Sequence, residues 1–118
     1  MAKPMSTHLR THYDLALRQA AEARRRGDLK EAWRLLERAH VIGQEWIAPH
    51  LRSHWEMLRL GWFMGDGREV VGQLLRLALV IPGTWLGRLP LGNTGGANVN
   101  PFRPLPLPDD LRQLLAEN

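Results

Sequence analysis

Apolar side chains recur at every third or fourth position through most of residues 1–82, which is the period of an amphipathic helix. Glycines at the breaks in this pattern divide the stretch into segments, and short turns of this kind join antiparallel helices. The pattern predicts helices from Thr7 to Arg26, from Asp28 to about Ile42, from Pro49 to about Met64, and from Gly67 to a stop at Pro82-Gly83.

The turn between the first two predicted helices resembles the turn between the last two. Residues 27–32 (GDLKEA) match residues 65–70 (GDGREV) at an offset of 38 positions. In this weak repeat, a unit of two helices joined by a Gly-Asp turn occurs twice, at a period close to that of tetratricopeptide hairpins. We therefore expect an all-α fold, either a four-helix antiparallel bundle or two tetratricopeptide-like helical hairpins.

The composition changes after Pro82, because residues 83–108 are rich in glycine and proline and almost without charge. Such a segment cannot form a regular helix, so we expect an irregular strap that packs back across the bundle. Asp109 or Asp110 should then cap a short last helix from Leu111 to Ala116. The chain is expected to be one domain, residues 1–118, made of a bundle (1–82) and a strap with its short helix (83–118).

Histidine placement is the most informative chemical feature of the sequence. At about 100° of rotation per residue, the third helix puts His50 and His54 on the same narrow stripe as Met57. On the second helix, His40 lies in line with Leu36. Because these two helices are predicted to form a tight hairpin, the three imidazoles should converge.

An imidazole buried without a partner costs about 1–3 kcal/mol, so this cluster needs hydrogen bonds or a metal ion. The i, i+4 spacing of His50 and His54 allows both to bind one ion, and Glu37-x-x-His40 has the spacing found in carboxylate-bridged metal bundles. His12 could reach the cluster from the edge of the first helix. We therefore predict a metal site of Glu37, His40, His50, His54 and His12, for Zn, Ni, Cu or Fe.

Two other interpretations of the cluster remain open at this stage. The histidines could form a purely structural hydrogen-bond network, with Glu37, Gln44 or Glu45 as partners, inside a helical protein-interaction module. Haem ligation by paired histidines, or a pocket for a small organic ligand, would be a further use. No additional acid is directed at the stripe, so binding is favoured over catalysis.

Charge and cysteine content narrow the classes of function. The chain has 16 basic and 12 acidic residues, but the arginines are scattered among acids, and the only run, Arg24–Arg26, complements the dipole at a helix end. Nucleic acid is therefore not an expected partner, whereas a protein partner or a homo-oligomer is possible. The absence of cysteine limits a metal site to nitrogen and oxygen ligands.

The sequence also bears on location. The first ten residues lack the apolar stretch of a signal peptide, and no run approaches the roughly 18 apolar residues of a membrane span. We therefore expect a cytoplasmic protein.

The fourth predicted helix carries an apolar face of Val70, Leu74, Leu77 and Ile81. This spacing is typical of the buried side of a helix, so we expect these residues to face the core.

Three separated motifs are similar to those of a bacterial family of small proteins known only as a domain of unknown function. They are LERAHVIGQ (36–44), PHLRSHWEML (49–58) and LGNTGGANV (91–99). The resemblance covers about Tyr13 to Leu115 and carries no activity. It implies that the His40 segment, the His50/His54 pair and the Gly-Asn-Thr-Gly-Gly loop are signature positions. Asn93, Thr94 or Asn98 of that loop would then orient the imidazoles from outside the ligand set.

Overall fold

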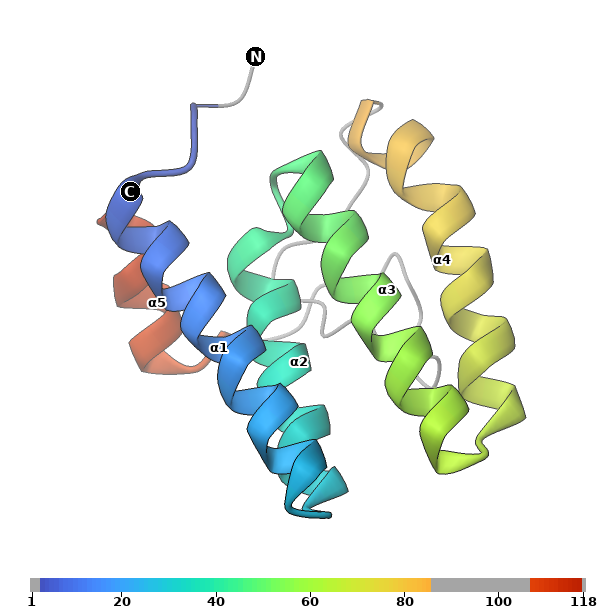
Figure 1. Cartoon of the computed structure of the whole chain (residues 1–118). Helices are drawn as coiled ribbons and strands as arrows, with labels where there is room; N and C mark the ends of the chain where they lie inside the picture. The colour runs from blue at the N-terminus through green and yellow to red at the C-terminus, as the bar shows by residue number, and fades with distance from the viewer. Residues whose placement is uncertain (1–2, 86–106, 118) are drawn as a thin grey trace.

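Five helices make up the described part of the chain, which contains no strand (Figure 1). The computed structural model describes residues 3–85 and 107–117, and within the fourth helix it describes side chains only as far as Leu79. The helices are α1 (Thr7–Arg25), α2 (Leu29–Gly43), α3 (Ile47–Met64), α4 (Gly67–Trp85) and α5 (Asp109–Ala116). The predicted all-α class is therefore confirmed.

The first four helices pack in chain order. α1 lies against α2, α2 against α3, and α3 against α4, while α5 packs against α2 (Figure 1). This order forms two consecutive hairpins, α1–α2 and α3–α4, and the helix pairs pack against one another as in an all-α bundle. The middle pair, α2 and α3, joins the hairpins.

The turns within the two hairpins are built in the same way. Gly27 and Gly65 both have positive φ, at 81° and 72°, a conformation that glycine adopts without steric cost. The next residue then caps the following helix, because Asp28 and Asp66 each accept a hydrogen bond from the backbone N–H three residues later, at 3.2 and 3.0 Å. The repeat in the sequence is thus a repeat of turn structure.

The beginning of α3 is tied to α1. The Tyr13 hydroxyl of α1 donates a buried hydrogen bond of 2.7 Å to the Pro49 carbonyl. Gly43, the last residue of α2, lies between these two side chains, and a Cβ there would be 2.8 Å from Pro49 Cβ and 2.9 Å from Tyr13 Cε2. Only glycine allows this approach, which brings the end of α2 against the start of α3.

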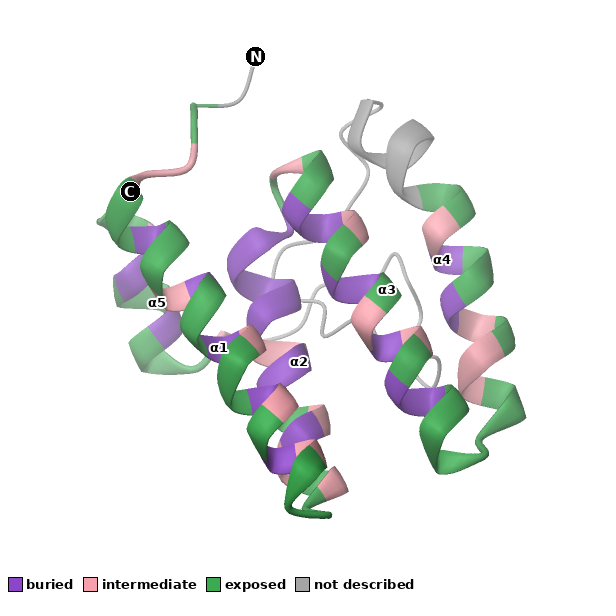
Figure 2. Cartoon of the chain, viewed as in Figure 1, coloured by how far each residue is buried: buried purple, intermediate pink, exposed green. Residues whose placement is uncertain are grey.

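Two apolar clusters surround the point where the hairpins meet (Figure 2). One joins α1, α2 and α5 around Leu9 and Ile42, and the other joins α1, α2 and α3 around Leu36 and Met57. Small alanines on the inner face of α1 allow α2 to approach closely. The last turn of α2 is consequently buried, as are Pro49, His50, Ser53 and His54 of α3.

Two predicted boundaries differ from the structure. α4 continues through Pro82-Gly83 to Trp85, because proline has a helical φ and here removes only one backbone N–H in the last turn. α5 begins at Asp109, before the expected Leu111. The strap prediction for residues 86–106, including the Gly-Asn-Thr-Gly-Gly loop, lies outside the described residues. Among the described helices, none is both long and apolar enough to cross a membrane.

Candidate metal centre

Three histidines from two helices meet in the buried region between the hairpins. His40 comes from the last turn of α2, and His50 and His54 come from successive turns of α3. Each residue is only 2% exposed. Their Nε2 atoms form a nearly equilateral triangle, with His40–His50 and His50–His54 separations of 3.0 Å and a His40–His54 separation of 3.2 Å. The predicted convergence of these imidazoles is confirmed.

Hydrogen bonds alone cannot satisfy all three sides of this triangle. A neutral imidazole nitrogen either carries a hydrogen and donates or carries a lone pair and accepts. Around a ring of three atoms, donors and acceptors cannot alternate, so at least one side must bring two donors or two acceptors together. That contact is repulsive at 3.0–3.2 Å in a buried site.

A metal ion would remove this conflict, since it binds the lone pairs of all three nitrogens. Imidazole nitrogens bind zinc at about 2.0–2.1 Å, and His40, His50 and His54 would hold such an ion through their Nε2 atoms.

The tautomer of His54 is fixed by α4. Its Nδ1 lies 2.7 Å from the side-chain oxygen of Gln73, and the Gln73 amide nitrogen donates to Glu69 Oε1, also at 2.7 Å. Because Glu69 accepts from the amide nitrogen, the Gln73 oxygen must face His54, whose Nδ1 therefore carries the hydrogen. The His54 Nε2 is left with a lone pair that points into the triangle, as a metal ligand requires.

Burial keeps the imidazoles neutral. Loss of hydration lowers the pKa of His50 to about 3, with the neighbouring His54 adding to the effect. Loss of hydration also lowers the pKa of His54 to about 4, partly opposed by the hydrogen bond to Gln73 and assisted by the positive charge of Arg76. His50 and His54 are therefore uncharged at neutral pH, each with a single hydrogen on one of its two ring nitrogens.

One protein family matches most of the length of the chain. The model of one family, described as a protein of unknown function (DUF3703), matches residues 7–115. The chain belongs to DUF3703. No curated protein and no solved structure matches it. The resemblance to a family of unknown function is thus confirmed.

The buried face of α4 in this DUF3703 chain is not the apolar one that the sequence pattern predicts. Leu74 was expected to face the core but is 54% exposed, whereas Gln73 is fully buried and Arg76 is 7% exposed. The reason is the hydrogen-bonding demand of His54, which an apolar face cannot meet. Glu69, Gln73 and Arg76 follow helical spacing through an otherwise apolar segment, and that polar stripe was the signal available in the sequence.

The other two predicted ligands lie apart from the triangle. Among the described residues, the potential ligand atoms of His40, His50 and His54 lie within 4.8 Å of one another. His12 is half-buried on α1, with its ring 4.8 Å from that of His8. Glu37 lines a surface cavity beside Trp33. The DUF3703 chain therefore brings together three of the five predicted ligands.

Gln44 and Glu45, two of the expected hydrogen-bond partners of the histidines, differ in exposure. Gln44 is buried, with 5% of its surface exposed, and Glu45 is exposed. The suggestion that Asn93, Thr94 or Asn98 orients the imidazoles lies outside the residues that the structure describes. Gln73, supported by Glu69, is the described side chain that performs this role in the DUF3703 chain.

Proposed function

We propose that this protein binds one transition-metal ion through the Nε2 atoms of His40, His50 and His54. The observation that carries the proposal is the triangle itself, in which three buried nitrogens lie 3.0–3.2 Å apart and the three contacts between them cannot all be hydrogen bonds. A cation accepts all three lone pairs at once. The lowered pKa of His50 and His54 supports the proposal, because neutral imidazole is the form that binds metal.

The donor set limits the identity of the ion. Three imidazoles without sulfur suit Zn²⁺, Ni²⁺, Cu²⁺ or Fe²⁺ better than the hard ions Mg²⁺ and Ca²⁺, which prefer oxygen. The hydrogen bond from His54 to Gln73, which in turn contacts Glu69, is the kind of outer support that metal-ligating histidines have. We assign binding of the ion to this site, and no reaction.

The competing function is a helical interaction module in which the histidines only form a hydrogen-bond network. The short contacts among the three imidazoles and with Gln73 are also compatible with such a network. The two functions differ in one measurable property, because the network predicts a protein that is purified without metal and takes up none.

Metal content and metal titration test the proposal. The protein is produced without a polyhistidine tag, analysed for bound metal, stripped, and titrated with Zn²⁺, Ni²⁺ and Cu²⁺ by calorimetry. We expect one equivalent of at least one of these ions to bind, and His40→Ala, His50→Ala and His54→Ala each to weaken binding by at least tenfold.

Two substitutions serve as controls. His12→Ala removes a histidine that lies outside the triangle, and Glu37→Gln removes the predicted carboxylate ligand. Both variants should keep the stoichiometry and affinity of the unchanged protein. Equal, weak binding by the unchanged protein and all three triangle variants would exclude the metal function.

A further inference from the structure

A second candidate site lies between α1 and α3, on the face of α3 that points away from the histidines. The two helices are separated there by a cavity of about 230 Å³, whose floor is formed by α2. Its apolar lining includes Ala20 of α1, Leu36 of α2 and Leu60 of α3. We call it the α1–α3 groove. An apolar floor in a surface groove favours a partner with apolar side chains.

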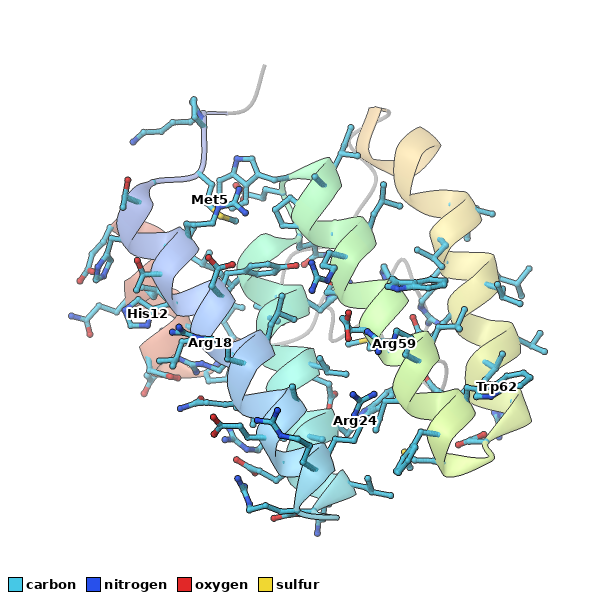
Figure 3. All side chains as sticks on the ribbon, in the orientation of Figure 1. Met5, His12, Arg18, Arg24, Arg59 and Trp62 are labelled. Carbon is cyan, nitrogen blue, oxygen red and sulfur yellow. The ribbon has the colours of Figure 1, made fainter. Side chains whose placement is uncertain are left out.

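Four arginines line the same groove. Arg18 and Arg24 come from α1, and Arg52 and Arg59 come from α3. Figure 3 labels Arg24 and Arg59 between the two helices. Among the described residues of the lining, Glu56 is the one acidic side chain. The groove therefore combines an apolar floor with a strong excess of positive charge along its walls.

The hydrogen bond between Tyr13 and Pro49 sets the register of these arginines. It joins the first halves of α1 and α3, which run in the same direction (Figure 1). Arg18 and Arg52 follow shortly after that bond, and Arg24 and Arg59 lie about 9–10 Å further along their helices, at 1.5 Å per residue. Each end of the groove thus has one arginine from either wall.

Contacts across and along the groove hold these side chains in place. Arg24 lies over the ring of Phe63 on α3, with 6.0 Å between its guanidinium carbon and the ring centroid. Glu56 lies between the two α3 arginines, 3.1 Å from Arg52 and 3.2 Å from Arg59. Its carboxylate is 19% exposed, whereas those two arginines are 59% and 46% exposed, so Glu56 neutralises them only in part.

We propose that the α1–α3 groove binds a short acidic segment of a partner protein, in which two carboxylates flank apolar residues. A polyproline II segment has three residues per turn and advances about 3.1 Å per residue, so carboxylates three residues apart lie on one side and span about 9 Å, close to the separation of the two arginine pairs. The intervening apolar side chains would cover Ala20, Leu36 and Leu60. A nucleic acid carries a negative charge at every nucleotide and has no aliphatic side chains to cover the apolar floor of the groove. A peptide is therefore the favoured ligand.

The proposal is tested with a labelled peptide in which Glu-Leu-Leu-Glu is flanked by glycine and serine. Binding to the full chain is measured by fluorescence anisotropy, beside a peptide with Gln in place of both Glu residues. We expect the acidic peptide to bind at least tenfold more tightly than the neutral one. Arg24→Gln and Arg59→Gln should each weaken the acidic peptide about tenfold, since each removes a charge-assisted hydrogen bond.

Glu56→Gln separates the proposal from simple loss of folding. It removes the carboxylate that competes for Arg52 and Arg59, so we expect it to tighten binding of the acidic peptide about three- to tenfold. A misfolded variant could not show such a gain. None of these substitutions touches the histidines, so metal uptake should be unchanged in all of them, and either site can fail without the other.

Three results would overturn the groove proposal. The first is no binding of the acidic peptide at millimolar concentration, and the second is equal binding of the acidic and neutral peptides. The third is tighter binding of a single-stranded RNA oligonucleotide than of the acidic peptide, lost in Arg24→Gln, which would identify a phosphate backbone as the ligand.

Discussion

Gln73 of α4 accepts a hydrogen bond from His54 Nδ1 of α3 at 2.7 Å, and this contact joins α4 to the histidine triangle. Both residues are buried, so neither group can exchange this partner for water. The contact leaves the His54 Nε2 lone pair pointing at His40 and His50. Metal binding at this site should therefore depend on a residue that does not touch the ion.

Gln73→Leu tests that dependence. The buried His54 N–H loses its acceptor, which should lower the free energy of unfolding by roughly 1–3 kcal/mol. Metal affinity should fall about 10- to 100-fold, as it does when other outer partners of ligating histidines are removed. Urea unfolding of the stripped protein and calorimetry with Zn²⁺ measure the two effects separately.

Two neighbouring substitutions are the controls for Gln73→Leu. Glu69→Gln keeps an acceptor for the Gln73 amide and should retain most of the affinity. Leu74→Ala changes the exposed residue next to Gln73 and should leave both stability and metal binding unchanged. If Gln73→Leu destabilises the fold but binds metal as tightly as the unchanged protein, His54 does not need this partner for metal binding.

Acid should destabilise the metal-free protein. The pKa values of His50 and His54, about 3 and about 4, lie below the ordinary 6.5, so between these values the unfolded chain binds protons that the folded chain does not. The free energy of unfolding should therefore fall as the pH falls from 6.5 towards 4, by at most about 1.4 kcal/mol per pH unit for each imidazole. Urea unfolding at several pH values measures this slope.

A variant shows whether the slope comes from the cluster. His50→Phe removes one of the buried imidazoles and should make the pH dependence shallower over the same range. A slope that is unchanged in His50→Phe would mean that other groups produce the acid sensitivity.

Metal should stabilise the fold in a way that depends on the triangle. An ion that binds the folded state at a free concentration of 100 times its dissociation constant adds about 2.7 kcal/mol. Thermal unfolding of the stripped protein should therefore shift upward on addition of Zn²⁺, whereas His54→Ala should show little shift. The same shift in both proteins would indicate metal bound elsewhere on the chain.

Gly43→Ala tests the close contact at the junction of the hairpins. The added methyl group would lie 2.8 Å from Pro49 Cβ and 2.9 Å from the Tyr13 ring, and because both neighbours are rigid, we expect a loss of roughly 1–3 kcal/mol in unfolding free energy. Gly67→Ala is the matched control, since no atom lies within 4 Å of its Cβ position and alanine favours helix. Thermal and urea unfolding should show a loss only for Gly43→Ala.

The sequence was sufficient to predict the triangle because the relations within it are local. His50 and His54 share a face through helical geometry alone, and His40 meets them because the connection after Gly43 is short. The hydrogen bond from His54 to Gln73 was not predicted. Because α4 has apolar residues on several faces, its buried face could not be identified from the sequence pattern. There, apolar spacing pointed to Leu74, whereas the buried His54 selects the face that carries Gln73.

The positions of His12 and Glu37 relative to the triangle could not be predicted from the sequence for a different reason. Both lie near the buried face of their helices in a helical projection, but a projection does not give the distance to a neighbouring helix. In the structure, the ring of His12 lies beside His8 and Glu37 lines a surface cavity. Side-chain direction across a helix pair is set by how the helices pack, which one sequence does not provide.

The turn at Gly65-Asp66 is so short that its length determines which residue of α4 meets His54. Each residue of a helix turns it by about 100°, so inserting one amino acid between Asp66 and Gly67 would rotate α4 by that angle relative to α3. The chain could then keep either the intact turn or the Gln73 amide opposite His54, but not both. Deletions or insertions here should therefore be as damaging to the histidine cluster as substitution of Gln73 itself, although the turn is far from the cluster and exposed to solvent.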